Sequence, residues 1–348
     1  MRIDSEGKRA RASNGLYNYS ACKMKQHCGG ALASTRVLIG ATRCTVEMRI
    51  AMILDELTQL KRERSAILLA HNYQPGEIQE AADYVGDSFE LSKTASQSDR
   101  DVIVFCGVDF MAESAAILSP HKTVLLPVLE ASCPMSHMIT AADVRQLRTE
   151  HPEAQVVCYV NTSAAVKAES DICCTSANAI RVVNAVDTDQ IIFVPDRNLA
   201  HYVQMWTEKE LIAWDGYCPT HENITLQDIE ARRRAMPDIE VVVHPECRPE
   251  VIEAADFVYG TSGMLRHAKA STARRLLIGT EMGMLYRLQK ENPGKEFYPP
   301  SARAVCPNMK LTTLEAVVAA LEKMRYRVTV DETIRLRAKK ALEMMLQV

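Results

Sequence analysis

The sequence lacks the features that mark membrane, secreted and nucleic-acid-binding proteins. It has no apolar run near the roughly 20 residues that a bilayer-spanning helix needs, and its formal net charge of -3 offers no broad basic surface to a nucleic acid. It does not begin with a charged segment followed by a long apolar one, as a secretory signal does. We therefore expect a cytoplasmic protein that binds neither membranes nor nucleic acids.

Common nucleotide- and metal-binding motifs are also missing. No Walker A or GxGxxG pattern occurs, so nucleotide binding has little support. The chain has 11 cysteines, but a large α/β chain in a reducing compartment more often uses cysteines for metal binding, catalysis or packing than for disulfides. Cys133, Cys218 and Cys306 belong to no CxxC pair and no CxxxCxxC run, so zinc-ribbon and radical-enzyme spacings are absent.

Residues 1–47 differ from the rest of the chain. They are basic, contain Ser and Gly, and show no sustained periodicity, so we expect a disordered extension or a start codon assigned too early. Apolar residues at helical spacing begin near Met48. Cys22, Cys28 and Cys44 lie in the basic segment, and their spacing fits no compact metal site.

From residue 66 onward, short β-branched runs alternate with segments of helical periodicity. We expect buried strands at 67–69, 102–105, 124–126, 156–157, 191–194, 211–213, 241–243 and 276–278, and helices at 77–85, 109–118, 178–186 and 282–291. This alternation predicts an α/β fold whose parallel sheets are covered by helices on both faces. A period of about 86 residues divides it into three pseudo-symmetric three-layer αβα domains around a central site, at 48–150, 151–236 and 237–330. We expect a C-terminal helix, 331–346, to pack back on the first domain.

The strongest signal in the sequence is a pattern of residues that occurs three times. A strand-like run ends in a polar cluster, a hydroxyl residue follows 17 positions later, and a cysteine follows 59 to 62 positions after the start of the cluster. The three copies are His71-Asn72-Tyr73 with Ser88 and Cys133, Tyr159-Val160-Asn161 with Ser176 and Cys218, and His244-Pro245-Glu246 with Thr261 and Cys306. Because loops at the carboxyl ends of parallel strands form crevices, we expect the three copies to converge.

Three thiolates from three domains suit a metal centre. Zinc with three protein ligands keeps a fourth position open for chemistry, and an iron–sulfur cubane with three cysteines leaves one iron free as a Lewis acid. The spacing favours a metal site over three buried thiols but does not choose the metal. Packing is the expected role of the remaining cysteines of the α/β region, which are Cys106, Cys158, Cys173, Cys174 and Cys247.

The clusters and hydroxyls supply groups for acid–base chemistry and anion binding. Glu246 is the only carboxylate in the three clusters, so we expect it to be the general base. Ser88, Ser176 and Thr261 each precede a helical segment, where hydroxyl and backbone N–H groups suit phosphate or carboxylate groups. For any one of them alone, an ordinary helix cap is the simpler interpretation.

At these residues the chain resembles the quinolinate synthase A family of de novo NAD biosynthesis. The resemblance runs from about residue 50 to 325. The matching stretches are AHNYQPGEIQEAADYVGDSFELS (70–92), FCGVDFMAESAAILSPHKTVLLPVLEASCPM (105–135), YVNTSAAVKAESDICCTSANA (159–179), PDRNLAHYV (195–203), GYCPTHENI (216–224), HPECRPEVIEAADFVYGTSGM (244–264), GTEMGMLYRLQKENPGKEFYP (279–299) and CPNMKLTTLEAV (306–317).

The resemblance implies a transferase-type synthase that condenses iminoaspartate (iminosuccinate) with dihydroxyacetone phosphate to give quinolinate, phosphate and two waters. It implies one [4Fe–4S] cluster per subunit, held by Cys133, Cys218 and Cys306 and acting as a Lewis acid. The implied substrate-binding positions are His71, Ser88, Tyr159, Val160, Asn161, Ser176, His244, Pro245, Glu246 and Thr261, and the catalytic ones are Glu246, Tyr73, Tyr159 and His221. Functional coupling to an aspartate oxidase or aspartate dehydrogenase would follow.

The sequence departs from the family pattern at two places, and two alternative functions are also considered. Asn72 stands where some family members have an aromatic residue, and the extra cysteines that some carry before the last ligand are absent here, which leaves no redox pair beside Cys306. The alternatives are a zinc-dependent lyase or hydrolase with a three-cysteine site, and a thiol-rich binding protein without catalytic activity.

Overall fold

The computed structural model describes residues 33–348, with side chains from Met48 onward. The chain divides into one unit of residues 1–49 and a second of residues 50–348. Helix α1 spans Ala33–Glu63 and therefore begins before Met48, where the periodicity predicted its start. Residues 33–47 carry no apolar stripe of the kind that periodicity detects, which explains the difference. The prediction made for residues 1–32 lies outside the described residues.

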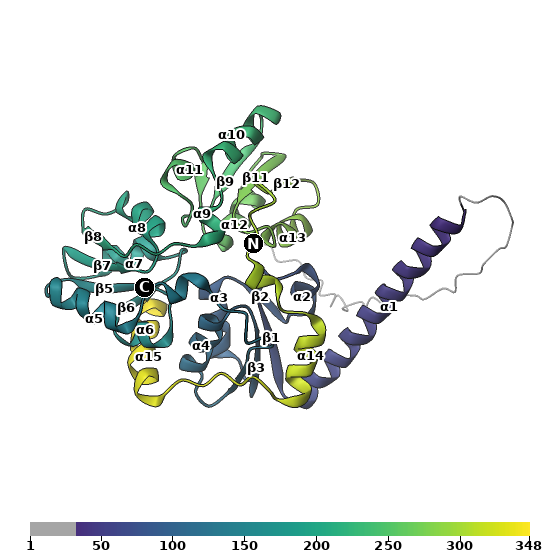
Figure 1. Cartoon of the computed structure of the whole chain (residues 1–348), viewed down its shortest axis with the longest axis horizontal. Coiled ribbons are helices and arrows are strands. Elements are labelled where there is room, and N and C mark those ends of the chain that lie inside the picture. The colour runs from purple at the N-terminus through teal and green to yellow at the C-terminus, as the bar shows by residue number, and fades with distance from the viewer. Residues whose placement is uncertain (1–32) are drawn as a thin grey trace, which may run out of the picture. The chain divides into compact units, whose positions relative to one another are not determined.

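The second unit contains three four-stranded parallel sheets with the same topology (Figure 1). Their strand orders are β2-β1-β3-β4, β6-β5-β7-β8 and β10-β9-β11-β12. The strands are β1 (Ala66–His71), β2 (Tyr84–Gly86), β3 (Val102–Cys106), β4 (Thr123–Leu125), β5 (Gln155–Tyr159), β6 (Ile172–Cys174), β7 (Gln190–Val194), β8 (Glu210–Ala213), β9 (Glu240–Val243), β10 (Phe257–Val258), β11 (Arg275–Gly279) and β12 (Glu296–Tyr298). The predicted α/β fold of three layered parallel sheets is confirmed.

Helices connect the strands and cover the sheets. The first sheet is joined by α2 (Gly76–Ala81), α3 (Ser88–Gln97) and α4 (Asp109–Leu118), the second by α6 (Ala164–Ala168), α7 (Ala179–Ala185) and α8 (Arg197–Gln204), and the third by α11 (Pro249–Glu253), α12 (Thr261–Ala270) and α13 (Met284–Glu291). The central strands are almost completely buried, as parallel strands covered on both faces must be. The helix expected at 77–85 ends at Ala81, because Tyr84–Gly86 forms strand β2.

An aspartate fixes the first edge strand of each sheet in the same way. Its carboxylate accepts the N–H of a residue in the neighbouring central strand, 15 positions earlier, and its own N–H donates to that residue's carbonyl. The pairs are Asp83 with Leu68, Asp171 with Val156, and Asp256 with Val241. Both backbone groups at the start of the central strand are thus satisfied, which places the polar cluster at the opposite end of that strand.

Each sheet is followed by a cysteine, a proline-initiated turn and a capped helix. The turns are η1 (Pro134–His137), α9 (Pro219–Glu222) and η2 (Pro307–Lys310), and the helices are α5 (Ala141–Glu150), α10 (Leu226–Ala235) and α14 (Leu314–Lys323). Proline suits the first position of such a turn because it has no N–H to leave unpaired. Thr140, Thr225 and Thr313 accept an N–H of the helix that each caps. Each threonine lies seven residues after its cysteine, so the threefold repeat extends beyond the polar clusters, hydroxyl residues and cysteines.

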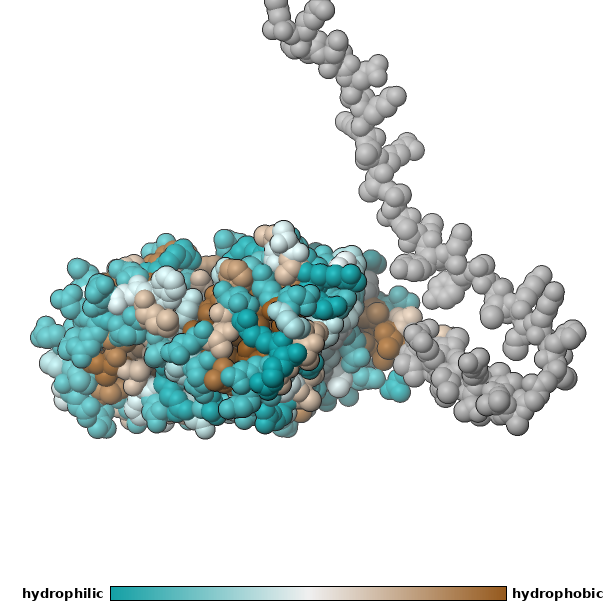
Figure 2. Space-filling model, turned by 90° about the horizontal axis from the view of Figure 1, so that it is seen from above, coloured by the Kyte–Doolittle hydropathy of each residue, from teal (hydrophilic) through white to brown (hydrophobic). Residues whose placement is uncertain are grey.

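The C-terminal helix α15 (Glu332–Gln347) contacts α4 beside the first sheet and, more extensively, α6 and β6 of the second. Figure 1 shows it in yellow between these elements. Figure 2 shows a face of the molecule that is mainly hydrophilic, with hydrophobic residues in small groups. Within residues 33–348, no helix combines the length and apolar character that crossing a membrane requires.

Candidate functional site

A cavity lies where the carboxyl ends of strands from all three sheets meet. Of the 15 residues that the sequence predicted for the site, 13 line this cavity: His71, Tyr73, Ser88, Cys133, Tyr159, Asn161, Ser176, Cys218, His221, His244, Glu246, Thr261 and Cys306. Val160 and Pro245 are buried nearby but are not among the lining residues. The N–H of Val160 donates to the carbonyl of Cys174, which extends the pairing of β5 with β6.

The three cysteines enter the cavity from equivalent positions. Their φ angles are -96°, -83° and -90° and their ψ angles 115°, 113° and 106° for Cys133, Cys218 and Cys306. Burial raises the pKa of all three thiols. A thiolate at Cys306 raises the pKa of Cys133 further, and one at Cys133 raises that of Cys218, because the negative charges share one cavity.

In the first and third domains a carboxylate of the same domain accepts the backbone N–H of the cysteine: Asp109 for Cys133 at 3.1 Å, and Glu281 for Cys306 at 3.2 Å. Asp196 is the equivalent acid of the second domain, but its Oδ1 accepts the N–H of Leu199 and its Oδ2 has no hydrogen-bond partner among the described residues. Each acid lies two or three residues after the third strand of its sheet and 22 to 25 residues before its cysteine. Our sequence analysis missed these acids, although this spacing was a signal that could have found them.

The donor set fits a metal centre that three thiolates bind. Three thiolates in a buried cavity need a cation to be stable together, and a metal ion or cluster would supply that charge. The remaining cysteines of the described chain are fully buried and do not line the cavity: Cys106, Cys158, Cys173, Cys174 and Cys247. The cavity therefore offers three cysteine thiols from the described residues and no fourth.

His71 and His244 occupy matching positions at the carboxyl ends of β1 and β9 and form matching hydrogen bonds. Nδ1 of His71 accepts the N–H of Tyr73 at 3.2 Å, and Nδ1 of His244 accepts that of Glu246 at 3.3 Å. An Nδ1 that accepts carries no proton, so each neutral ring has its proton on Nε2. Burial lowers the pKa of both histidines to about 3. Both rings are therefore neutral near pH 7 and available as hydrogen-bond donors.

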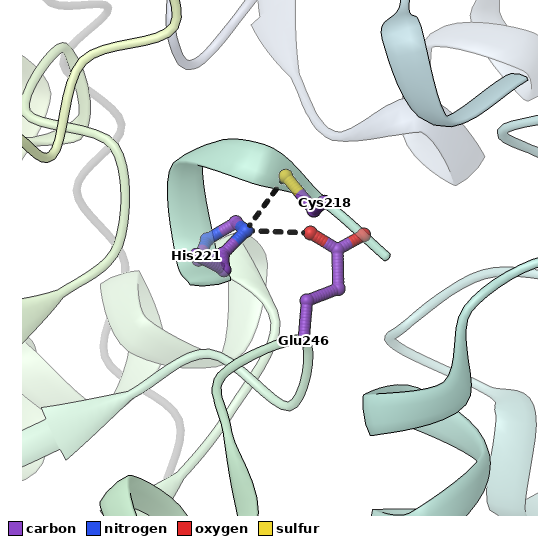
Figure 3. Close-up of side chains that lie close together, drawn as sticks. All are labelled: Cys218, His221 and Glu246. Atoms are coloured by element: carbon purple, nitrogen blue, oxygen red, sulfur yellow. Dashed lines mark hydrogen bonds and ion pairs between the residues drawn. The ribbon is translucent and has the colours of Figure 1, made fainter. Parts of the chain in front are cut away.

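Glu246, His221 and Cys218 form a compact buried group (Figure 3). Nδ1 of His221 lies 2.7 Å from Oε2 of Glu246 and 3.2 Å from Sγ of Cys218. Burial by itself raises the pKa of the Glu246 carboxyl, but electrostatic attraction to the imidazoles of His244 and His221, together with the hydrogen bond from His221, outweighs burial and lowers the pKa to about 2. The carboxyl is therefore ionised. Its other oxygen, Oε1, is buried and has no hydrogen-bond partner among the described residues.

One atom of each residue lies within 4.8 Å of the others in this group, so Cys218, His221 and Glu246 could also hold a single metal ion. This arrangement competes with the three-cysteine set because Cys218 belongs to both. A metal count decides between them, since a cubane contains four irons and a mononuclear site contains one ion.

The hydroxyl residues lie at the starts of helices, as the sequence predicted. Ser88 and Thr261 are the first residues of α3 and α12, and Ser176 lies in the turn before α7. Gly260 precedes Thr261, and a Cβ atom on it would lie 2.8 Å from Oγ of Ser176. Glycine thus allows the second and third domains to approach closely, which brings two of the three hydroxyls together.

Several polar groups of the cavity are available to bind a ligand. Oδ1 of Asn161 is buried and has no hydrogen-bond partner among the described residues. Thr261 accepts a hydrogen bond from Nδ2 of Asn72 at 2.9 Å, which leaves its hydroxyl proton free to donate elsewhere. Burial and the charge of Glu246 raise the pKa of Tyr73 and of Tyr159 well above the ordinary value, so both phenols remain protonated.

Comparison with known proteins adds a family to this geometry. The model of the family described as "Quinolinate synthetase A protein" matches residues 55–347. The chain is 55% identical over 294 residues to the quinolinate synthase of Thermodesulfovibrio yellowstonii, covering 84% of this chain and 97% of the relative. It is 54% identical over 301 residues to that of Dehalococcoides mccartyi, covering 86% and 100%. It is 52% identical over 301 residues to quinolinate synthase 1 of Methanosarcina acetivorans, covering 86% and 99%.

Proposed function

Because this chain belongs to the quinolinate synthetase A protein family, we propose that it condenses iminoaspartate with dihydroxyacetone phosphate. The products are quinolinate, phosphate and two waters, and the atoms balance without an external oxidant or reductant. The observation that carries the proposal is the convergence of three cysteines and an ionised, half-partnered Glu246 in one cavity. Such a site can combine Lewis-acid and general-base chemistry.

A [4Fe–4S] cluster held by Cys133, Cys218 and Cys306 would supply one iron without a protein ligand, able to polarise a substrate hydroxyl, carbonyl or imine. The three similar backbone conformations and the three carboxylates behind them support this ligand set. Asp109 and Glu281 orient the backbones of Cys133 and Cys306 through hydrogen bonds, as hydrogen-bond partners of ligand residues do in metal sites generally.

Glu246 acts as the general base in this proposal. Its Oε2 is held by His221, and its unpartnered Oε1 is free to take a proton from carbon. Because Oε1 has no hydrogen-bond partner among the described residues, its lone pairs are available to a nearby C–H group without a competing donor. The two condensing carbons must lie within reach of Oε1 for this step.

Tyr73 and Tyr159 are the proton donors, because each phenol is buried in its protonated form. They can donate to a developing enolate or to a departing hydroxide. The substrates bring two carboxylates and a phosphate. The Nε2–H groups of His71 and His244, together with the hydroxyls at the helix starts, are the donors that face these anions.

The proposed substrate also indicates what must supply it. An α-imino acid forms when the C–N bond of an amino acid loses two hydrogens, and water hydrolyses the imine readily. We propose that an oxidation of aspartate, by an oxidase or a dehydrogenase, provides iminoaspartate close to this enzyme in the cytoplasm. The buried cavity then protects the imine from water until the condensation is complete.

The metal test separates the proposed function from its competitor. Protein purified without oxygen is expected to contain about four irons and four acid-labile sulfides per chain. About one zinc per chain would instead favour a zinc-dependent lyase or hydrolase that uses a mononuclear site. Protein without bound metal, and without effect on iminoaspartate, would favour a thiol-rich binding protein.

Removal of residues 1–47 is expected to leave the specific activity and the iron content unchanged. The family match begins at residue 55, and the apolar residues of α1 that pack on the core follow Met48. Quinolinate formation by the shortened chain is the measurement. A second truncation that begins at Arg64 removes the fully buried Leu57 as well and is expected to lower Tm. Loss of folding in the first truncation would contradict the expectation.

A further inference from the structure

The side chain of Asn72 joins the first domain to the third beside the cavity. Its Nδ2 donates a hydrogen bond to Oγ1 of Thr261 at 2.9 Å, and its Oδ1 accepts one from Nη1 of Arg287 at 2.9 Å. Asn72 follows β1 of the first sheet, whereas Thr261 begins α12 and Arg287 lies in α13 of the third domain. Asn72 is completely buried, and of the three residues only Thr261 lines the cavity.

Arg287 determines which way the amide of Asn72 faces. A guanidinium group only donates hydrogen bonds, so the oxygen of the amide must face it. Nη1 of Arg287 also donates to the carbonyl of Val85 in the first sheet at 2.7 Å, and its Nε donates to Oε1 of Glu291 at 2.7 Å. These bonds hold the guanidinium in place across the domain boundary. The NH2 group of Asn72 is therefore directed at Thr261.

The amide in turn determines the direction of the Thr261 hydroxyl. An NH2 group cannot accept a hydrogen bond, so Oγ1 of Thr261 accepts from it and the hydroxyl proton must point elsewhere. Because Thr261 lines the cavity, that proton is available to a ligand there. The sequence of donors thus runs from Arg287 through Asn72 and Thr261 into the cavity, and a donor at its end suits an anionic group.

The threefold repeat does not account for an amide at this position. The second residues of the other two polar clusters are Val160 and Pro245, and neither side chain can form a hydrogen bond. The three sheets share one topology without such an amide. Asn72 therefore departs from the repeat at the place where it contacts a hydroxyl of the cavity.

We propose that Asn72, oriented by Arg287, is a positioning residue for substrate binding: it keeps the Thr261 hydroxyl as a hydrogen-bond donor to a phosphate or carboxylate group of the substrate. This inference rests on the proposed function, in which both substrates are anions, and names the residues that set the polarity of one contact. Asn72 and Arg287 touch no substrate in this account. A hydroxyl can donate or accept, and only the donating arrangement favours an anion.

Asn72→Asp tests the proposal because it exchanges the amide nitrogen for an oxygen and keeps the shape. A carboxylate only accepts, so the Thr261 proton would turn toward it and be lost to the substrate, while Arg287 would pair with the new charge. We expect KM to rise about 10- to 100-fold for the substrate whose anionic group Thr261 binds, with kcat within about threefold of the wild-type value. Separate KM values for dihydroxyacetone phosphate and iminoaspartate show whether that group is the phosphate or a carboxylate.

Arg287→Gln tests the same arrangement from further away and serves alone if Asn72→Asp does not fold. A glutamine amide can donate to Asn72 or accept from it, so it no longer fixes the orientation of the asparagine. We expect the same KM to rise by a smaller factor, about three- to tenfold. Asn184→Asp is the control: Asn184 is exposed, bonds Trp206 and Thr207 through its amide, and does not line the cavity, so both KM values should stay unchanged.

A double-mutant cycle shows whether the effect of Asn72 passes through Thr261. In a Thr261→Val protein no hydroxyl remains to be turned, so the addition of Asn72→Asp is expected to change the affected KM by less than about threefold. Iron and sulfide contents should be the same in all of these proteins.

Two results would overturn the inference while leaving the proposed function intact: wild-type KM values for both substrates in the Asn72→Asp protein, or an equally large effect of Asn72→Asp in the Thr261→Val background. A wild-type protein that forms no quinolinate would overturn the proposed function and, with it, this inference. The two failures are thus distinguishable in one series of assays.

Discussion

Replacement of Cys218 by alanine is expected to abolish both the visible absorbance of the cluster and quinolinate formation. In the proposed site Cys218 would provide one of three thiolates from three domains, so its loss would leave two ligands for four irons. The cavity offers no substitute thiol from the described residues, because the other described cysteines are fully buried away from it. Iron and sulfide content, the absorption spectrum and quinolinate yield of anaerobically prepared protein are the measurements.

Cys106→Ala is the matched control for this experiment. Cys106 ends β3, is completely buried, and does not line the cavity. Its replacement removes one buried sulfur and should lower stability slightly, as other truncations of core side chains do. The cluster and the activity should survive. A Cys218→Ala protein with a complete set of iron and sulfide would contradict the assignment of this ligand.

Replacement of Glu246 by glutamine is expected to lower kcat by about 10²–10⁴-fold while the cluster remains. Glutamine has the same shape, and its carbonyl oxygen can still accept the His221 N–H. It cannot accept a proton from carbon, which is the task proposed for Oε1. The measurements are kcat from quinolinate formation, and iron content from the same preparation.

Glu240→Gln provides a close control for Glu246→Gln. Glu240 begins β9 of the same sheet and also pairs with a histidine, with Oε1 2.8 Å from Nε2 of His267. It lies at the opposite end of the strand from the cavity and is not a lining residue. Its conversion should leave kcat unchanged. Wild-type turnover in the Glu246→Gln protein would show that another residue acts as the base.

The sequence predicted the central strands of the fold and the edge strands β4 and β8, but it missed the other four edge strands. Strands such as Val102–Cys106 and Gln190–Val194 are buried runs whose length and β-branched composition identify them. The strands that were missed, β2, β6, β10 and β12, contain two or three residues each. Runs this short carry no readable period. At β2 the helical pattern was also extended too far, because Asp83 binds the chain to β1 and ends the helix.

The site was predictable where its chemistry recurs in sequence and not where it depends on contacts across domains. The common spacing of clusters, hydroxyls and cysteines pointed to one centre, and their side chains line one cavity. The carboxylates behind the cysteines also recur, but at 22 to 25 residues, a spacing that becomes meaningful only once the cysteines are known. Thr280 lies across domain boundaries, with Oγ1 2.6 Å from the phenolic oxygen of Tyr73 and 2.8 Å from Nε2 of His221. The corresponding residues of the other two domains have no hydroxyl group, so no repeat could reveal these contacts.

The most direct test of the account is the origin of the carbon atoms in the product. Anaerobically purified wild-type protein would receive iminoaspartate generated in the reaction mixture and dihydroxyacetone phosphate labelled with ¹³C at all of its carbons. If the three domains meet to condense these two substrates, mass spectrometry will show quinolinate that carries every labelled carbon of the triose phosphate, with release of inorganic phosphate. Unlabelled quinolinate, or none from protein with a complete cluster, would contradict the central claim.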